Sequence, residues 1–365
     1  MGETPENRDL AGKVSGQVVG QGLHATGSPF DGGCDGRSLA AGLEPTLRKT
    51  LEAEHGAELG KIEWFKAAWQ RSGSATGFAE LLCPTGRVIE VAIKLPVQPR
   101  EHRWTTGLGT VDLAAWESAE ARALPVPRVF AGGTELGGYD LAWVVMEKFH
   151  GGTAREKFDK QEVEGLLEAA ADFQAMARGH KPVDEPCESR DWAGLIEKSR
   201  ASLRDTDVPQ PQKWNATLKR VQKLLPRLTE LWCGRPCTCW CHGDLHPGNA
   251  MRRDPHPEKG EPGRLVLIDL GLVHPGHWVE DAVYVERQFW GSKDGLKGIK
   301  PVPTMSRARK RNGLTTAGDH MTLANVRRVL MAACVPAYAA VEGTRAYTES
   351  ALELLDRLLP TVSSV

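Results

Sequence analysis

The sequence lacks the long hydrophobic runs and the strong charge bias that would assign the chain to a membrane or a nucleic acid. No run of about 18 apolar residues occurs in the sequence, so we expect no transmembrane helix. Lysine and arginine number 46 and aspartate and glutamate 47, which leaves a formal net charge of -1. A near-neutral chain has no general electrostatic attraction for nucleic acid or for an anionic membrane. The sequence therefore predicts neither as a partner.

The amino-terminal residues lack both the apolar core of a signal peptide and the basic pattern of a transit peptide. We therefore expect a cytoplasmic protein. Residues 1–42 are rich in glycine, serine and aspartate without sustained periodicity, which predicts a flexible tail. The ordered part is expected to begin near Glu44, where Leu43, Leu47 and Leu51 recur at helical spacing. Nothing in the sequence indicates the oligomeric state.

Four of the eight cysteines lie between residues 233 and 241. Free thiols are the default in a reducing compartment. Cys237, Cys239 and Cys241 alternate with a period of two, which places them on one face of a predicted strand. Side chains along one strand face rarely close a tetrahedron, so packing as small hydrophobic residues is favoured over a zinc site.

Two apolar runs, residues 77–83 and 87–95, are separated by a Pro-Thr-Gly turn and predict a β-hairpin. Apolar residues alternate along the second run, so Ala92 and Lys94 share the face that points away from the sheet core. The Gly/Ser segment 72–77 just upstream has a flexible backbone that could fold over phosphate oxygens, although a simple turn is an alternative.

Strand patterns come early in the chain and helical patterns late, which predicts an α+β chain with two lobes. A helix is expected over 112–123, a buried strand over 141–146, a linker over 147–152 and helices at 163–177 and 321–359. The amino-terminal lobe, a small antiparallel sheet, is expected over residues 43–148. The larger, mainly helical lobe is expected over 149–365.

The segment 242–249, His-Gly-Asp-Leu-His-Pro-Gly-Asn, carries the groups that phosphoryl transfer needs. Asp244 lies on a tight loop, Asn249 follows five positions later, and Asp269 ends a predicted strand. Together they could orient a hydroxyl and hold Mg²⁺ against ATP. Asp244 or Asn249 alone could be a turn-stabilising residue. His242 is expected to brace the loop by hydrogen bonds rather than to act as a base.

In their order and spacing these pieces resemble the aminoglycoside phosphotransferase and choline kinase family, which has the protein-kinase-like fold. The likeness runs from about residue 62 to residue 289. Its pieces are Val-Ala-Ile-Lys at 91–94, a helical glutamate after it, Pro-x-Pro-Arg-Val at 125–129, Val-Val-Met-Glu at 144–147, the His-Gly-Asp segment and Ile-Asp at 268–269. The glycine loop is sparse, with Gly73 and Gly77 only.

The resemblance implies a role for each matching residue. Lys94 would contact the α- and β-phosphates of ATP and would be paired by a helical carboxylate, Glu117 or alternatively Glu120. Asp244 would be the catalytic residue that orients the acceptor hydroxyl, and Asn249 and Asp269 would ligate Mg²⁺.

The nucleotide base is expected to lie against the sheet. The resemblance implies that the backbone of Glu147 to Phe149 receives the adenine and that Ala92 packs against its flat ring. Ser74 is expected near the phosphates.

A hydroxyl of a small molecule is favoured over a protein as the acceptor, because Asp281 follows Asp269 too closely for an activation loop between them. Glu280 and Asp281 could face a polycation, and Trp278, Tyr284, Phe289 and Trp290 could cage a quaternary amine, but structural roles are the commoner explanation.

The basic segment 293–311 is expected to be a solvated loop, or alternatively a flap over an anionic substrate. Two other functions stay open at this point: a catalytically silent nucleotide-binding protein, and a protein kinase.

Overall fold

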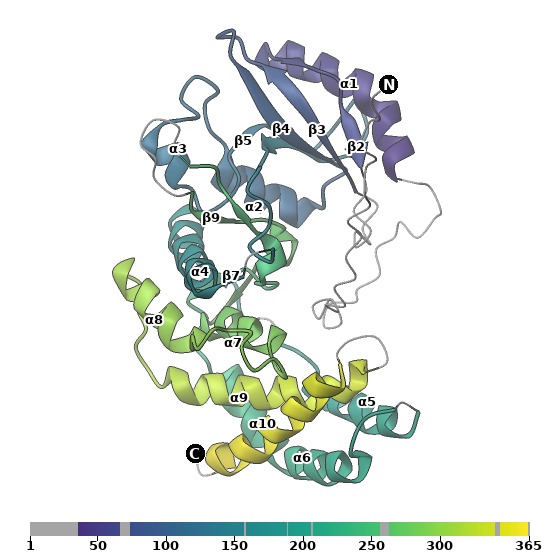
Figure 1. The fold of residues 1–365 in the computed structure, drawn as a ribbon, viewed down its shortest axis with the longest axis vertical. Coiled ribbons are helices and arrows are strands. Elements are labelled where there is room, and N and C mark those ends of the chain that lie inside the picture. Colours follow the sequence, from purple (N-terminus) through teal and green to yellow (C-terminus); the bar gives the residue numbers. More distant parts are fainter. Residues whose placement is uncertain are drawn as a thin grey trace, which may run out of the picture.

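A computed structural model describes residues 36–65, 74–156, 158–187, 189–205, 207–255, 263–339 and 344–363. The chain forms two lobes, a sheet with flanking helices and a larger helical part (Figure 1). The α+β, two-lobed prediction is therefore confirmed. Most of the tail predicted over 1–42 and the first residues of the Gly/Ser segment, 72–73, lie outside the described residues.

The amino-terminal lobe is built on a six-stranded antiparallel sheet, within the described residues, in the order β1-β3-β4-β6-β5 with β2 paired to β3. The strands are β1 Glu58–Leu59, β2 Glu63–Phe65, β3 Ala75–Leu82, β4 Val88–Leu95, β5 Val129–Gly133 and β6 Trp143–Glu147. β3 and β4 form the predicted hairpin, with Thr76 opposite Lys94 and Phe78 opposite Ala92. On its other edge β4 pairs with β6, which sets Met146 opposite Ala92.

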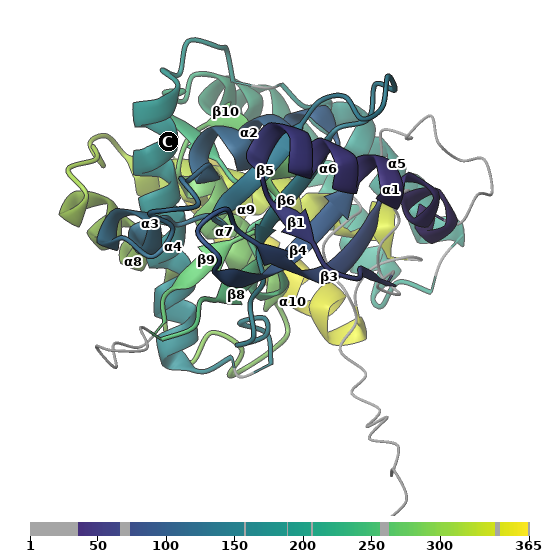
Figure 2. The same ribbon diagram turned by 90° about the horizontal axis from the view of Figure 1, so that it is seen from above.

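Helix α1, Gly36–His55, contacts β1, β2 and β3 and lies across the sheet when seen from above (Figure 2). The helix begins before the expected start near Glu44. Its buried stripe of Leu47 and Leu51 extends two turns back to Ala40, and that burial stabilises the additional turns.

Helix α2, Pro99–Gly109, contacts β5 and β6 of the sheet and also reaches α4 and the short 3₁₀ turn η2, Leu270–Leu272, of the other lobe. This helix was not predicted from the sequence. The helix expected over 112–123 is wrong in extent, since only α3, Ala119–Ala123, is helical there. The side chain of Asp112 accepts a hydrogen bond from the Ala114 backbone and holds a turn instead.

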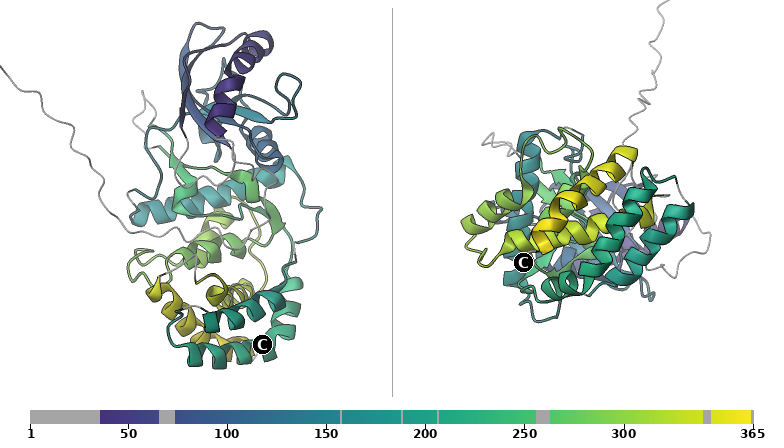
Figure 3. Two further views of the ribbon diagram at one scale, coloured as in Figure 1. Left: turned by 90° about the vertical axis from the view of Figure 1, so that its right-hand side faces the viewer. Right: turned by 90° about the horizontal axis from the view of Figure 1, so that it is seen from below.

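The carboxyl-terminal lobe is a helical assembly around one apolar core, with short strands at its contact with the sheet (Figure 3). Its helices are α4 Lys160–His180, α5 Trp192–Asp205, α6 Pro211–Cys233, α7 Val279–Gln288, α8 Pro301–Arg311, α9 His320–Ala333, η3 Val335–Tyr338 and α10 Arg345–Ser363. Strand β7, Cys239–Cys241, pairs with β10, His274–Gly276. Strand β8, Ala250–Arg252, pairs with β9, Leu265–Leu267, and the short turn η1, Pro247–Asn249, precedes β8. No helix in the described ranges is long and apolar enough to cross a bilayer.

The basic segment 293–311 is not a loop throughout. Its second half is α8, which contacts α4 and α7 and buries Val302, Met305 and Ala308 at helical spacing. The prediction of a solvated loop or flap is wrong for that half, because the apolar stripe docks it as a helix on α4 and α7; Arg309 is buried there, while Arg307, Lys310 and Arg311 stay exposed.

Candidate active site

Lys94 on β4 is paired with Glu101 on α2, and the two charged atoms lie 2.5 Å apart. Both side chains are largely buried, at 15% and 10% exposure. Burial by itself lowers the pKa of Lys94, but the carboxylates of Glu101 and Asp269 outweigh it and raise the pKa above its ordinary value. The lysine therefore keeps its positive charge inside the fold.

Glu101 replaces Glu117 and Glu120 as the partner of the lysine, so the sequence-based choice was wrong. Glu117 forms an exposed ion pair with Arg87 instead, at 2.7 Å. Glu120 lies on the short helix α3. A proline at the first position of α2, five residues after Lys94, was a local signal for a helix that starts early enough to carry the partner.

Asp269 lies between the two lobes. It follows β9 with a left-handed backbone, φ 61°, and begins the turn η2, which packs against α2. Burial and the nearby Asp269 carboxylate raise the pKa of Glu101, an effect that Lys94 opposes. The lysine, its glutamate and the predicted metal ligand therefore form one electrostatic group.

The first residues of the loop over 242–249 are hydrogen bonded to the side chain of Asp281 at the start of α7. Its two oxygens accept the backbone N–H groups of His242 at 3.0 Å and Gly243 at 3.1 Å. His242 accepts the Asp244 backbone N–H on Nδ1, at 3.2 Å, and directs Nε2 at the Ile268 carbonyl, at 3.0 Å. The bracing role predicted for His242 is confirmed.

Gly243 is required by the loop geometry. Its φ of +85° favours glycine, and a Cβ atom there would lie 2.2 Å from the Leu272 carbonyl oxygen. The backbone of the loop therefore packs directly against the backbone of the turn after Asp269. This contact fixes the position of Asp244 relative to Asp269.

Asp244 is buried, and its two oxygens have different partners. The hydroxyl of Tyr284 donates to Oδ1 at 2.6 Å, and the side-chain amide of Asn249 donates to Oδ2 at 3.1 Å. Burial favours the neutral acid, but hydrogen bonds from His246 and Tyr284 lower the pKa of Asp244 below its usual value. The residue is a charged carboxylate. Tyr284 was considered only as part of a cage, and its bond to Asp244 was not predicted.

Asn249 and Asp269 lie at the same end of the β8–β9 pair. The backbone N–H of Ile268 donates to the Asn249 carbonyl at 2.9 Å, and Ala250 pairs with Leu267 in the next register position. The amide nitrogen of Asn249 donates to the Asp244 backbone and side chain, so the assigned side-chain oxygen is the atom left for another partner. An amide oxygen and a carboxylate are thus available beside Asp244.

The sheet offers a flat surface next to this group. Ala92, Lys94 and Met146 share one face of the sheet by register, and the apolar core of the lobe lies on the other. Ser74 is buried and directly precedes β3, two residues before Thr76, the register partner of Lys94. The phosphate-side role of Ser74 stays a prediction.

Glu147 ends β6 where the chain leaves the sheet. Its buried carboxylate accepts from Arg128 at 2.6 Å and from Arg253 of the other lobe at 3.1 Å. The side chain of Glu147 therefore joins the two lobes. Adenine recognition by the backbone from Glu147 to Phe149 remains a prediction.

A further pair of contacts bridges the lobes at the surface. The ring of His150 lies 2.7 Å from the carboxylates of both Glu90 and Asp254. Hydrogen bonding to Asp254 is the largest effect and raises the pKa of His150; burial opposes the rise, and hydrogen bonding to Glu90 adds to it. Lys148 also pairs with Glu90, at 2.6 Å.

The prediction that the cysteines alternate along a strand as small hydrophobic residues is confirmed for Cys239 and Cys241. It is not confirmed for Cys237, which precedes β7 and is half-buried. Cys239 and Cys241 are buried in β7, and burial raises the pKa of Cys241 so that it remains a thiol. Among the described residues Cys241, His274 and Glu280 could converge on one ion. Arg235 already binds that glutamate at 3.0 Å, and a protonated thiol is a poor metal ligand.

The geometry combines the fixed cation of Lys94, the carboxylates of Asp269 and Asp244, and the amide oxygen of Asn249. These groups can neutralise phosphate charge and orient a hydroxyl, which are the two requirements of phosphoryl transfer.

The chain is similar to a family model and to several solved structures. The model of the phosphotransferase enzyme family matches residues 110–301, more than half of the chain. No curated protein matches the chain. Among solved structures, the aminoglycoside phosphotransferase of Alicyclobacillus acidocaldarius is 14% identical, with a TM-score of 0.44 over 83% of this chain and 91% of that one.

Two other solved structures have similar statistics. A choline/ethanolamine kinase family protein from Mesorhizobium loti is 14% identical, with a TM-score of 0.49 over 88% of this chain and 97% of that one. A microcompartment-associated aminopropanol kinase is 14% identical, with a TM-score of 0.49 over 87% and 96%. Because its family model covers more than half of the residues, this chain belongs to the phosphotransferase enzyme family.

Proposed function

We propose that this phosphotransferase uses ATP with Mg²⁺ and transfers the γ-phosphoryl group to a hydroxyl of a small molecule. The observation that carries the proposal is the group formed by Lys94, Glu101 and Asp269 between the lobes. Asp244 and Asn249 lie on the adjoining loop and are hydrogen bonded to each other. A buried lysine that stays charged is suited to phosphate oxygens.

The residues present fit Mg²⁺. Asn249 and Asp269 would hold the ion through an amide oxygen and a carboxylate, the hard ligands that Mg²⁺ prefers alongside phosphate oxygens and water. When bound, Mg²⁺ neutralises charge on the transferred group. Lys94 would hold the α- and β-phosphates, and Glu101 would keep its ammonium group in position.

Asp244 would orient the acceptor hydroxyl. Its lowered pKa makes it a hydrogen-bond acceptor at neutral pH, and Tyr284 restricts one of its oxygens. The acceptor would approach the remaining lone pairs of the carboxylate. Positioning of this kind supplies much of the catalysis in phosphoryl transfer, because the protein makes no covalent bond to the phosphoryl group.

The interval after Asp269 favours a small acceptor over a protein. Residues 270–272 form η2, residues 274–276 form β10, and α7 begins at Val279. These elements occupy the whole interval to Asp281, which leaves no length for an activation loop. A silent nucleotide-binding protein has no chemical need for Lys94, Asp244, Asn249 and Asp269 together.

The test is ADP release by purified protein with Mg²⁺ and a panel of hydroxyl compounds, alongside nucleotide binding by calorimetry. We expect Asp244→Asn to bind nucleotide as the wild type does and to lose acceptor-stimulated ADP release by at least about a thousandfold. Asp269→Asn should also lose Mg²⁺-dependent nucleotide binding.

Asp319→Asn is the matched control, because Asp319 caps the start of helix α9 by accepting the Thr322 backbone N–H. It should turn over normally. Wild-type turnover by Asp244→Asn would contradict the site assignment. Nucleotide binding by the wild type without stimulation by any acceptor would support the silent nucleotide-binding protein instead.

A further inference from the structure

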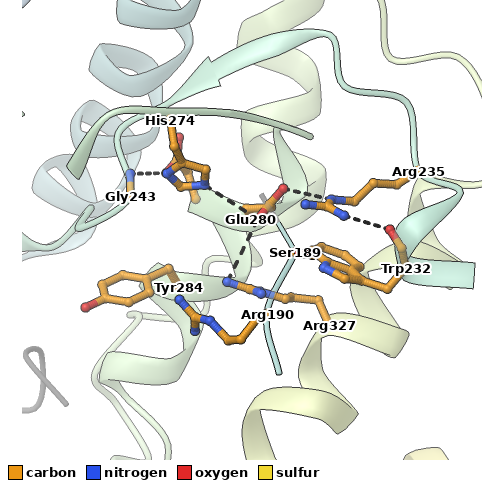
Figure 4. Close-up of a pocket in the computed structure, with 10 residues that line it drawn as sticks. Ser189, Arg190, Trp232, Arg235, Gly243, His274, Glu280, Tyr284 and Arg327 are labelled. Carbon is orange, nitrogen blue, oxygen red and sulfur yellow. Dashed lines mark hydrogen bonds and ion pairs between the residues drawn. The ribbon is translucent and has the colours of Figure 1, made fainter. Parts of the chain in front are cut away.

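A pocket lies directly beside the 242–249 loop and is lined by both that loop and the helices beneath it. Gly243 of the loop and Tyr284, the partner of Asp244, form one side. Three arginines, Arg190, Arg235 and Arg327, form another (Figure 4). They come from the segment before α5, the segment just after α6, and α9 itself. The pocket is therefore one side chain away from the carboxylate that would orient the acceptor.

The carboxylates of the pocket are already engaged. Glu280 is shared by Arg235 at 3.0 Å, His274 at 3.7 Å and Arg327 at 3.9 Å. The oxygens of Asp281 accept the backbone of the loop and the side-chain amide of Gln174. The pocket thus has three arginines against two engaged carboxylates, and its lining carries a net positive charge.

Two of the arginines have buried donors without an acceptor among the described residues. These are Nη1 of Arg190 and Nε of Arg327. Arg327 is only 8% exposed, and burial together with Arg190 and Arg235 lowers its pKa to about 10. Buried polar groups are nearly always hydrogen bonded, so unpartnered cationic donors indicate a missing anionic acceptor.

The arginines are held in place by tryptophans. The Arg190 guanidinium lies 5.5 Å from the Trp192 ring centroid, and Arg327 lies 5.4 Å from Trp192 and 5.0 Å from Trp232. Arg235 lies 4.2 Å from Trp232. Cation–π contacts orient guanidinium groups without consuming all their N–H donors. The positive lining is thus pre-organised for a ligand.

We propose that this pocket binds an anionic group of the phosphoryl acceptor, a carboxylate or a phosphate, while the acceptor hydroxyl lies at Asp244. The inference rests on the proposed function and names its substrate class. Planar guanidinium groups bind both oxyanions through paired hydrogen bonds. A polycationic aminoglycoside or a quaternary amine would meet like charge at Arg190, Arg235 and Arg327.

The first experiment measures anion binding without turnover. Acetate and inorganic phosphate are titrated into wild type, Arg190→Gln and Arg345→Gln while thermal unfolding is followed. Arg345 is the matched control, since it is 79% exposed and pairs only with Glu349 of its own helix in the described structure. We expect saturable stabilisation of the wild type and the control, and binding at least about tenfold weaker in Arg190→Gln. The preferred anion identifies carboxylate or phosphate.

The second experiment measures ADP release with a hydroxy carboxylate, an alcohol phosphate, glycerol and ethanolamine. An anionic acceptor should be preferred, and Arg190→Gln should raise its KM by about tenfold or more with little change in kcat. Equal anion binding by wild type and Arg190→Gln would overturn the inference, as would turnover of ethanolamine alone.

The two levels of the proposal can fail separately. Anion binding that depends on Arg190, with no turnover of any compound, would support the pocket and contradict the proposed phosphotransfer to this acceptor class. Turnover of ethanolamine with no anion binding would support the phosphotransferase and contradict the pocket.

Discussion

Replacement of Glu101 by glutamine removes the carboxylate that positions Lys94 and keeps its size. The pair is 2.5 Å apart and mostly buried, so it is a charge-assisted hydrogen bond sheltered from solvent. Bonds to charged groups contribute about 1.5 to 3 kcal/mol. Since about 1.36 kcal/mol corresponds to tenfold in rate, kcat/KM for ATP should fall by about 10- to 150-fold. Asp269 still faces Lys94 and should prevent a larger loss.

Glu117→Gln is the matched control, because it alters the carboxylate that the sequence alone favoured. Its ion pair with Arg87 is exposed, with side-chain exposures of 54% for Arg87 and 34% for Glu117. Such pairs contribute about 0 to 1 kcal/mol, so activity should change less than about fivefold. The assay is steady-state ADP release against ATP concentration, with thermal unfolding to check that both variants fold. Normal kcat/KM in Glu101→Gln, or a greater loss in Glu117→Gln, would refute the assignment of Glu101.

Two further predictions concern stability. Gly243→Ala should lower the free energy of unfolding by about 3 kcal/mol or more, since the new Cβ would lie 2.2 Å from a carbonyl oxygen. Gly86→Ala is the control. Gly86 has a similar positive φ but open space around it, so this substitution should lower the free energy of unfolding by about 1 to 2 kcal/mol. Equal losses in urea unfolding would contradict the packing argument. His150 has a raised pKa, so its bridge stabilises the fold fully below about pH 6.5 and loses effect as pH rises through the raised value. The melting temperature of wild type minus that of His150→Gln should therefore be larger at about pH 5.5 than at about pH 8.5. A difference in melting temperature that grows with pH would contradict a stabilising role of protonated His150.

The geometry of the loop over residues 242–249 could be predicted from the sequence because its determinants are local. Asn249 reaches the Asp244 side chain within five residues, and His242 accepts the Asp244 backbone two positions away. The hairpin that presents Ala92 and Lys94 is also local, since alternation and a short turn determine its register. Such features depend on nearby residues and on the backbone geometry that glycine permits at Gly243.

The limits of the helices were predicted less well. Two helices, α1 and α8, depend on apolar stripes that are buried only when neighbouring elements dock. Ala40 of α1 packs toward the sheet, which explains the early start of that helix, and Met305 of α8 packs toward α4 and α7. Packing of that kind overrides the local signals of proline and charge.

What the sequence by itself determined is the set of chemical groups: a lysine on a strand, an aspartate on a tight loop, an amide five residues after it, and a second aspartate after another strand. Only the tertiary structure decided which carboxylate meets Lys94, because Glu101 and Glu117 both follow it in the chain and the docking of α2 between the lobes selects the first. The tertiary structure likewise assembled Arg190, Arg235 and Arg327 around one pocket. Residues so far apart in sequence leave no local pattern, since their proximity arises from the packing of α5, α6 and α9 around a common core.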